Sequence, residues 1–231
     1  MTRGSVNVYH LKEDVTLSEI YKSNIEHAKQ IILLEEPPET HGDLVTFSPT
    51  LFVITKDKAY YILLDTVFAG RHKESPLEQV IPILSQMLTF DEKFGEILAY
   101  QTVAEGWGAK DIGDNYKHGD IEKMASRQEV LISIVQEKGK SAQSTTYGII
   151  REINSNKVKE LKLESEGEIK NESIPKTPPI PTDPKRLKII KDGVKKMMDE
   201  IKNNPDTNLG FHALEQHTQN WKPNYEGKDN A

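Results

Sequence analysis

The sequence predicts an α+β protein: an antiparallel sheet of five or six strands packed by two helices, followed by a linker and one amphipathic C-terminal helix. Segments rich in β-branched and aromatic residues are separated by short polar turns, as in antiparallel hairpins. Apolar residues recur at helical spacing in three other segments. Leu, Ile, Val and Phe are nearly twice as frequent in residues 1–163 as in 164–231. We therefore expect one α+β globular domain over residues 1–163.

The first two predicted helices begin at recognisable caps. Thr16 and Glu19 form a capping box, in which the hydroxyl accepts from first-turn amides and the carboxylate reaches back. Apolar residues then recur every three or four positions as far as Ile32, before a double proline. A second helix is expected over residues 75–88. Pro82 should kink or break it, because proline lacks the amide hydrogen that the helix ladder needs.

The predicted strands are short segments rich in β-forming residues and bounded by polar turns. The first two form a hairpin, and both of its strands are apolar at nearly every position, which indicates burial on both faces. The later strands follow one another through turns of a few polar residues, as expected of an antiparallel meander. The segments are residues 50–55, 59–64, 96–104, 128–136, 141–153 and 158–163.

The last third of the chain has a different character. Residues 164–183 are first acidic and then rich in proline, so we expect an extended linker. A basic amphipathic helix is predicted over residues 184–203, with Asp183 as its cap and proline at its first position. Residues 204–231 show no clear period and are expected to form a flexible tail.

Composition excludes several classes of protein. The chain has no cysteine, which excludes disulfides, zinc–thiolate sites and cysteine nucleophiles. It has no run of about 18 apolar residues and no apolar stretch of the signal-peptide kind, so we expect a soluble, cytoplasmic protein without a transmembrane segment. The formal net charge is −6. Sequence-independent nucleic-acid binding relies on neutralising phosphates and is therefore not expected of the acidic domain.

One long connection is a candidate ligand or metal site. Residues 105–127 contain four glycines, and loops of this length in compact domains are typically functional or disordered. Trp107 and Tyr116 are candidates for ligand stacking. The side chains that suit Mg²⁺, Mn²⁺ or Ca²⁺ are Asp111, Asp114, His118 and Asp120. Their spacing does not match an EF-hand, so we expect a solvated surface loop without a cofactor, and a divalent-metal site is the alternative interpretation.

The C-terminal helix is the second candidate site. Its apolar residues step by three and four positions, which gives a seam two heptads long. This seam consists of Leu187, Ile190, Val194, Met197 and Ile201. Residues 184–202 also hold seven basic and three acidic residues. The seam could pack on the chain's own domain, or bind a protein partner or a second copy of the chain. A lipid or nucleic-acid surface bound by Lys185–Lys202 is a weaker alternative.

Motifs of common enzyme classes are absent from the sequence. It has no GxSxG nucleophile elbow, no GxxxxGK[ST] phosphate loop and no GxGxxG after a strand. We therefore expect a non-catalytic interaction or regulatory module that docks or self-associates through its C-terminal helix. The alternative is a divalent-metal-dependent hydrolase that uses the acidic glycine-rich loop 105–120, whose carboxylates could bind a metal and activate water.

Overall fold

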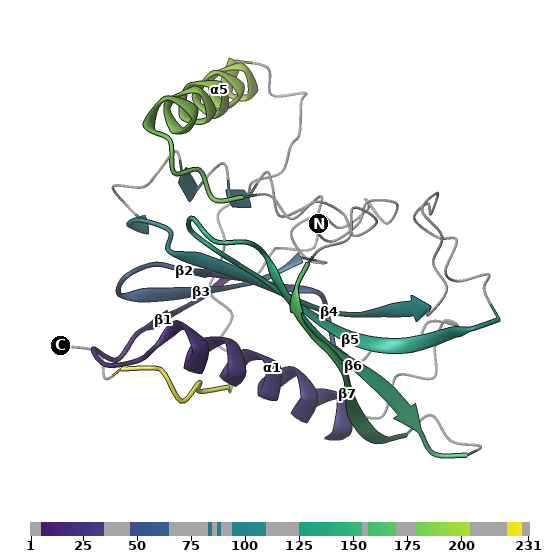
Figure 1. Ribbon diagram of the computed structural model, residues 1–231. Helices are drawn as coiled ribbons and strands as arrows, with labels where there is room; N and C mark the ends of the chain where they lie inside the picture. The colour runs from purple at the N-terminus through teal and green to yellow at the C-terminus, as the bar shows by residue number, and fades with distance from the viewer. Residues whose placement is uncertain are drawn as a thin grey trace.

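The protein is built on one antiparallel sheet, shown in a computed structural model (Figure 1). The structure describes residues 6–34, 47–64, 83–84, 87–88, 94–109, 125–153, 157–169, 179–203 and 221–227. Seven described strands run in the order β1-β3-β2-β4-β5-β6-β7. Their bounds are Val6–His10 (β1), Thr50–Ile54 (β2), Lys58–Leu63 (β3), Ala99–Ala109 (β4), Arg127–Glu137 (β5), Gln143–Arg151 (β6) and Val158–Glu168 (β7).

The predicted α+β class and antiparallel sheet are confirmed, but five or six strands was too low a number. The missed strand is β1, which pairs with β3 from Val6 opposite Ile62 to His10 opposite Lys58. It has only five residues and includes Asn7 and His10, so its composition gives a weak strand signal. Pairing with β3 over a long sequence separation places it in the sheet.

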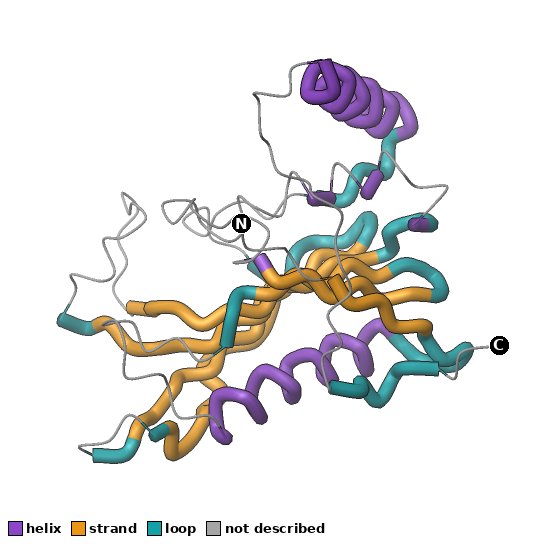
Figure 2. Tube along the Cα trace, turned by 180° about the vertical axis from the view of Figure 1, so that it is seen from behind, coloured by secondary structure: helices purple, strands orange, loops and turns teal. Residues whose placement is uncertain are grey.

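Two described helices lie on opposite sides of the sheet: α1 (Leu17–Leu34) and α5 (Pro184–Asn203) (Figures 1 and 2). The predicted capping box of α1 is present. The Thr16 amide donates to Glu19 Oε2 at 2.8 Å, and the Glu19 amide donates to Thr16 Oγ1 at 3.3 Å. These bonds satisfy two amides that a helix start otherwise leaves unpaired.

The sheet separates two hydrophobic clusters. On the α1 side, Ile20, Ala28 and Ile32 pack against strand residues such as Phe52 and Tyr61. The side chains of β2 and β3 alternate between the two faces, and β2 is buried at every position, as predicted. Side chains from described residues of the expected helix 75–88 cover the other face. These residues are Ile83, Leu84, Met87 and Leu88, and Ile180 from later in the chain packs in the same cluster.

Two strands, β4 and β7, end later in the sequence than predicted. β4 continues to Ala109 and pairs with β5 as far as Arg127, so the connection between these strands comprises residues 110–126. β7 continues to Glu168, so the acidic start of the predicted linker 164–183 is strand instead. Acidic residues in this segment suggested a linker, but alternate exposed positions of an edge strand also carry charge. The globular domain therefore extends beyond residue 163.

Gly148 of β6 leaves room for a side chain to cross its strand. Glu164 of β7 reaches over it and accepts a hydrogen bond from the Gln128 side chain of β5. A Cβ atom at position 148 would lie 2.6 Å from Glu164 Oε1. The glycine therefore permits a link between two strands that are not neighbours in the sheet.

We predict a measurable coupling between these two positions. Gly148→Ala should lower the free energy of unfolding by about 1 kcal/mol more in the natural sequence than in a Glu164→Ala chain. The reason is that alanine at position 148 displaces the Glu164 carboxylate from Gln128. Urea unfolding of the single and double variants measures the coupling. Gly106→Ala is the matched control, since nothing lies within 4 Å of a Cβ there. Equal effects of Gly148→Ala in both backgrounds would contradict the prediction.

Candidate functional site

The C-terminal helix begins as its sequence predicts. The Asp183 carbonyl accepts from the Leu187 amide at 2.9 Å, and its carboxylate accepts from the Lys185 amide at 3.1 Å. Just before the cap, Ile180 is buried in the hydrophobic cluster on the side of the sheet opposite α1. Ile180 thus anchors the start of α5 to the sheet, and the helix lies on the outer side of this anchor (Figure 1).

The predicted seam of α5 is partly covered. Leu187 and Ile190 are half-buried, and Val194 is 8% exposed. Met197 and Ile201 lie in the helix, but their side chains are outside the described part of the chain. Since the three described seam residues are buried or half-buried whereas most other described residues of α5 are exposed, the apolar side of α5 faces the chain itself.

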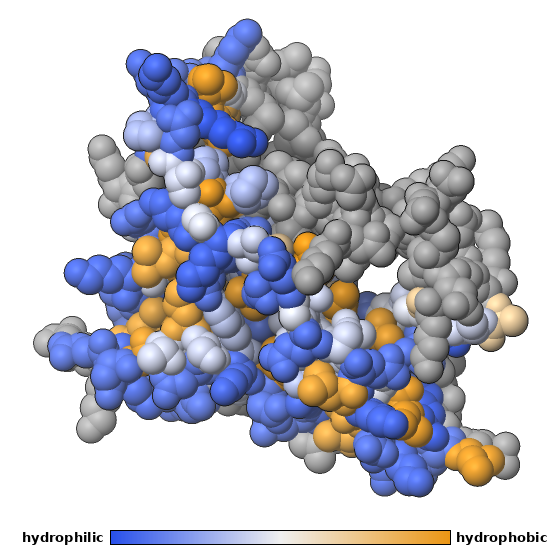
Figure 3. Space-filling view, viewed as in Figure 1, coloured by the Kyte–Doolittle hydropathy of each residue, from blue (hydrophilic) through white to orange (hydrophobic). Residues whose placement is uncertain are grey.

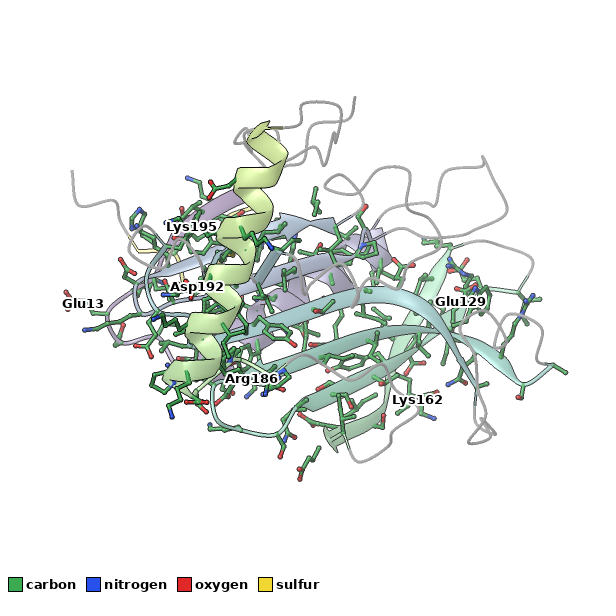
Figure 4. The ribbon with its side chains drawn as sticks, turned by 90° about the horizontal axis from the view of Figure 1, so that it is seen from above. Glu13, Glu129, Lys162, Arg186, Asp192 and Lys195 are labelled. Atoms are coloured by element: carbon green, nitrogen blue, oxygen red, sulfur yellow. The ribbon has the colours of Figure 1, made fainter. Side chains whose placement is uncertain are left out.

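The opposite side of α5 is exposed and mostly cationic. Lys185, Lys188 and Lys195 are exposed, and Ile189 beside them is 71% exposed. Arg186, Asp192 and Lys195 follow one another along the helix when the molecule is seen from above (Figure 4). The space-filling view shows this end of the molecule as mainly hydrophilic with a small hydrophobic patch (Figure 3).

The second predicted site is only partly described. Trp107 lies within β4, and the Arg127 guanidinium covers its ring at 4.7 Å from the centroid. Glu105 accepts a hydrogen bond from the Phe47 amide, which uses one carboxylate of the predicted loop for a structural contact. One face of the Trp107 indole is therefore occupied by the protein itself.

The remaining residues of that site lie outside the described part of the chain. They are Asp111, Asp114, Tyr116, His118 and Asp120. Within the described ranges, no three His, Asp or Glu side chains gather as a metal site would require. The metal-dependent hydrolase therefore stays a prediction about residues 105–120.

A chain of buried hydrogen bonds connects distant parts of the fold. The Tyr225 hydroxyl donates to Asn24 Oδ1 at 2.8 Å, and Asn24 Nδ2 donates to Gln101 Oε1 at 2.9 Å. Gln101 Nε2 then donates to Ser133 Oγ at 2.8 Å and to the Tyr21 carbonyl at 3.2 Å. Burial raises the pKa of the Tyr225 phenol, so its hydroxyl keeps the proton that Asn24 accepts.

This polar chain is structural in character. Asn24 and Gln101 are 0% exposed, Tyr225 is 1% exposed and Ser133 is 2% exposed. A substrate cannot reach groups that are enclosed in this way, whereas buried amides with satisfied partners fix how helix and sheet pack. Sequence analysis did not identify this cluster. The sequence did contain one indication of a buried polar group, because Asn24 lies on the apolar face of the helical pattern of α1.

The C-terminal segment forms an aromatic cluster beside α1. The Trp221 ring stacks on His27 with centroids 3.9 Å apart and an interplanar angle of 11°. The rings of Tyr9 and Tyr225 each lie nearly perpendicular to the Trp221 ring, with centroid distances of 5.5 and 6.2 Å. The tail predicted over residues 204–231 was therefore wrong for residues 221–227, which pack against the domain (Figure 2). Two aromatic residues four positions apart were the missed signal.

Comparison with known proteins gives no family for this chain. No protein-family model matches it, and no curated protein and no solved structure matches it either. Among the described helices, none is long and apolar enough to cross a membrane. The assignment of function therefore depends on the geometry of the described residues.

We predict that Gln101 contributes strongly to stability. Gln101→Leu should lower the free energy of unfolding by about 3 kcal/mol, because Asn24 and Ser133 lose partners in a dry environment. Denaturant unfolding followed by circular dichroism measures this change. Gln30→Leu on the exposed side of α1 is the control, with an expected change within about 0.5 kcal/mol. Similar losses for both variants would argue against the role of the network.

We also predict an acid-sensitive contribution from His27. Burial lowers the pKa of its imidazole to about 4, so the folded state holds it neutral. In the unfolded chain the imidazole binds a proton near the ordinary histidine pKa of about 6.5. The stability that neutral His27 contributes is therefore fully present above about pH 6.5 and is lost as the pH falls toward about 4.

Between pH 6.5 and 5.0 the free energy of unfolding of the natural chain should therefore fall by about 1.5 kcal/mol more than that of a His27→Phe variant. Urea unfolding at several pH values gives the difference between the two proteins. The comparison with the variant subtracts titrations elsewhere in the chain. Parallel pH profiles for the two proteins would disprove a buried neutral His27.

Proposed function

We propose that the protein is a non-catalytic interaction module whose partner-facing element is α5. The observation that supports the proposal is the difference in exposure between the two sides of this helix. Val194 is 8% exposed on one side, whereas Ile189 is 71% exposed on the other. The half-buried side anchors the helix, and the exposed side is available to another protein.

Charge supports the same assignment. Residues 184–202 hold seven basic and three acidic residues in a chain with net charge −6. Concentrating positive charge on one exposed helix creates a local field opposite to that of the whole molecule. The best complementary partner is a protein with an acidic surface around an apolar pocket for Ile189. Such pairing speeds association and selects among partners.

The anchoring of α5 supports the proposal further. Ile180 is 6% exposed and packs with Leu51, Tyr60 and Tyr100 of the sheet. The Asp183 cap then starts the helix within a few residues of this anchor. A helix that starts from a fixed point loses less conformational freedom when it binds, which favours affinity.

The described polar groups also favour binding over catalysis. Gln101, Asn24 and Tyr225 are enclosed and are used in hydrogen bonds between elements. Glu129 and Arg151 form an ion pair at 2.7 Å, and Arg127 stacks on Trp107. Each of these groups has a structural partner in the fold, which makes a binding surface the better-supported function.

Affinity purification with matched variants tests the proposal. The intact chain should recover a protein partner from an extract of its native cells. Lys188→Glu with Lys195→Glu should reduce recovery of the same partner by about tenfold or more, as should Ile189→Asp. Quantitative mass spectrometry and a subsequent titration of the purified pair measure the loss.

The chain offers controls for both changes. Lys159→Glu with Lys162→Glu makes the same charge change on exposed residues of β7, and Lys162 lies apart from α5 in the view from above (Figure 4). Ile153→Asp replaces an isoleucine that is 92% exposed. Both controls should bind as the natural chain does. Undiminished binding by the α5 variants would eliminate α5 as the partner-facing element.

A further inference from the structure

The C-terminal segment binds the domain through backbone hydrogen bonds and contains one turn. We call residues Trp221–Gly227 the strap. The Lys12 amide donates to the Tyr225 carbonyl at 3.0 Å, and the Gly227 amide donates to the His10 carbonyl at 2.6 Å. Leu11 and Glu226 form an antiparallel bridge. The strap thus adds a short stretch of β-pairing beyond the end of β1.

The strap packs through the side chains of Trp221, Pro223 and Tyr225. Trp221 stacks on His27, Pro223 is buried, and the Tyr225 hydroxyl donates to Asn24. Gly227 ends the pattern, because a Cβ there would lie 3.2 Å from the Leu11 carbonyl oxygen. Lys222 and Asn224 are exposed and Glu226 is half-buried, and the Asn224 carbonyl accepts from Lys12 Nζ. The Glu226 amide donates to the Pro223 carbonyl at 3.1 Å, so a turn separates the Trp221 contact from the bridge at Glu226.

The receptor side of this contact belongs to the first part of the chain. The strap contacts Asn24 and His27 of α1 and Tyr9, Phe52 and Tyr61 of the sheet, and we call this contact surface the groove. The strap follows α5 in the sequence, whereas the groove residues all belong to residues 9–61. Receptor and ligand are therefore separate in sequence.

We propose that this groove is a peptide-binding site for the pattern Trp-x-Pro-x-Tyr-x-Gly, filled in the structure by the chain's own strap. Its second ligand is the strap of another copy of this chain. The two copies present identical grooves and straps, so any fit within one chain is also available between two. This site does not depend on the role of α5.

Geometry and mass action set the conditions for exchange. The 18 residue steps from Asn203 to Trp221 can span at most about 60 Å, which allows a strap to reach a neighbouring body. A strap in the same chain competes at an effective concentration on the order of millimolar. Exchange should therefore be observed once the covalent link is cut, or at high protein concentration.

A cleavable but otherwise natural full chain tests the site. A specific protease sequence is inserted between Asn208 and Leu209, and the chain is cut after folding. We expect the released segment to stay with the body through gel filtration, and to exchange with a labelled synthetic peptide of residues 219–231. A segment that separates from the body on cutting, with or without loss of the fold, would overturn the proposal.

Two peptide variants make the result specific. Trp221→Ala should weaken binding by about 30-fold or more, as expected for a central aromatic anchor. Lys222→Ala should bind like the natural peptide, because Lys222 is exposed on the strap. Fluorescence anisotropy of the labelled peptide with the cut body measures both. Equal binding of the two variants would show that the groove does not read the pattern.

The occupant is tested with intact chains. Two differently tagged copies, incubated together near millimolar concentration, should co-purify as strap-exchanged pairs. Trp221→Ala in both copies should abolish the pairs, whereas Ile189→Asp on α5 should leave them intact. Absence of pairs from natural copies, or their persistence after Trp221→Ala, would overturn exchange between copies. Because Ile189→Asp affects only α5, failure of one proposal is distinguishable from failure of the other.

Discussion

The side-chain amide of Gln101 is the interaction on which the packing of the α1 side depends. It is 0% exposed in the central strand β4, where an unsatisfied amide would cost several kcal/mol. Its oxygen accepts from Asn24 of α1, and its nitrogen donates to Ser133 of β5 and to the Tyr21 carbonyl. A helix shifted by one residue along the sheet would break these bonds together. The amide therefore selects one position of α1, which apolar contacts alone would leave less well defined.

Fixing α1 also creates the groove for the strap. Asn24 uses its nitrogen toward Gln101 and its oxygen toward Tyr225, so one side chain connects the interior of the sheet with the C-terminal segment. One turn further along α1, His27 presents its ring to Trp221. Both contacts require the same rotation of the helix. The side of the sheet that holds α1 is thus closed by its own chain, whereas α5 on the other side exposes Ile189 and its lysines.

Local signals in the sequence predicted local structure well. The Thr16–Glu19 capping box, the buried hairpin β2–β3 and the Asp183 cap depend on residues a few positions apart. Features formed by distant residues could not be read in this way. Asn24 and Gln101 are 77 positions apart, and neither periodicity nor composition reveals such a pairing. For the same reason the stacking of Arg127 on Trp107 follows only from the register of β4 with β5.

Low apolar content explains why the strap was missed and also why it can act as a ligand. A segment with few core-forming residues cannot fold alone, but Trp221 and Tyr225 supply large aromatic surfaces at a small entropic cost. The backbone bonds to His10 and Lys12 give such a segment a defined register without a hydrophobic core of its own. A weakly hydrophobic C-terminal third is therefore compatible with one exposed helix and one segment that packs on the domain. The exposed lysines and Ile189 of α5 face solvent, whereas the strap packs against α1 and the end of β1 of its own chain.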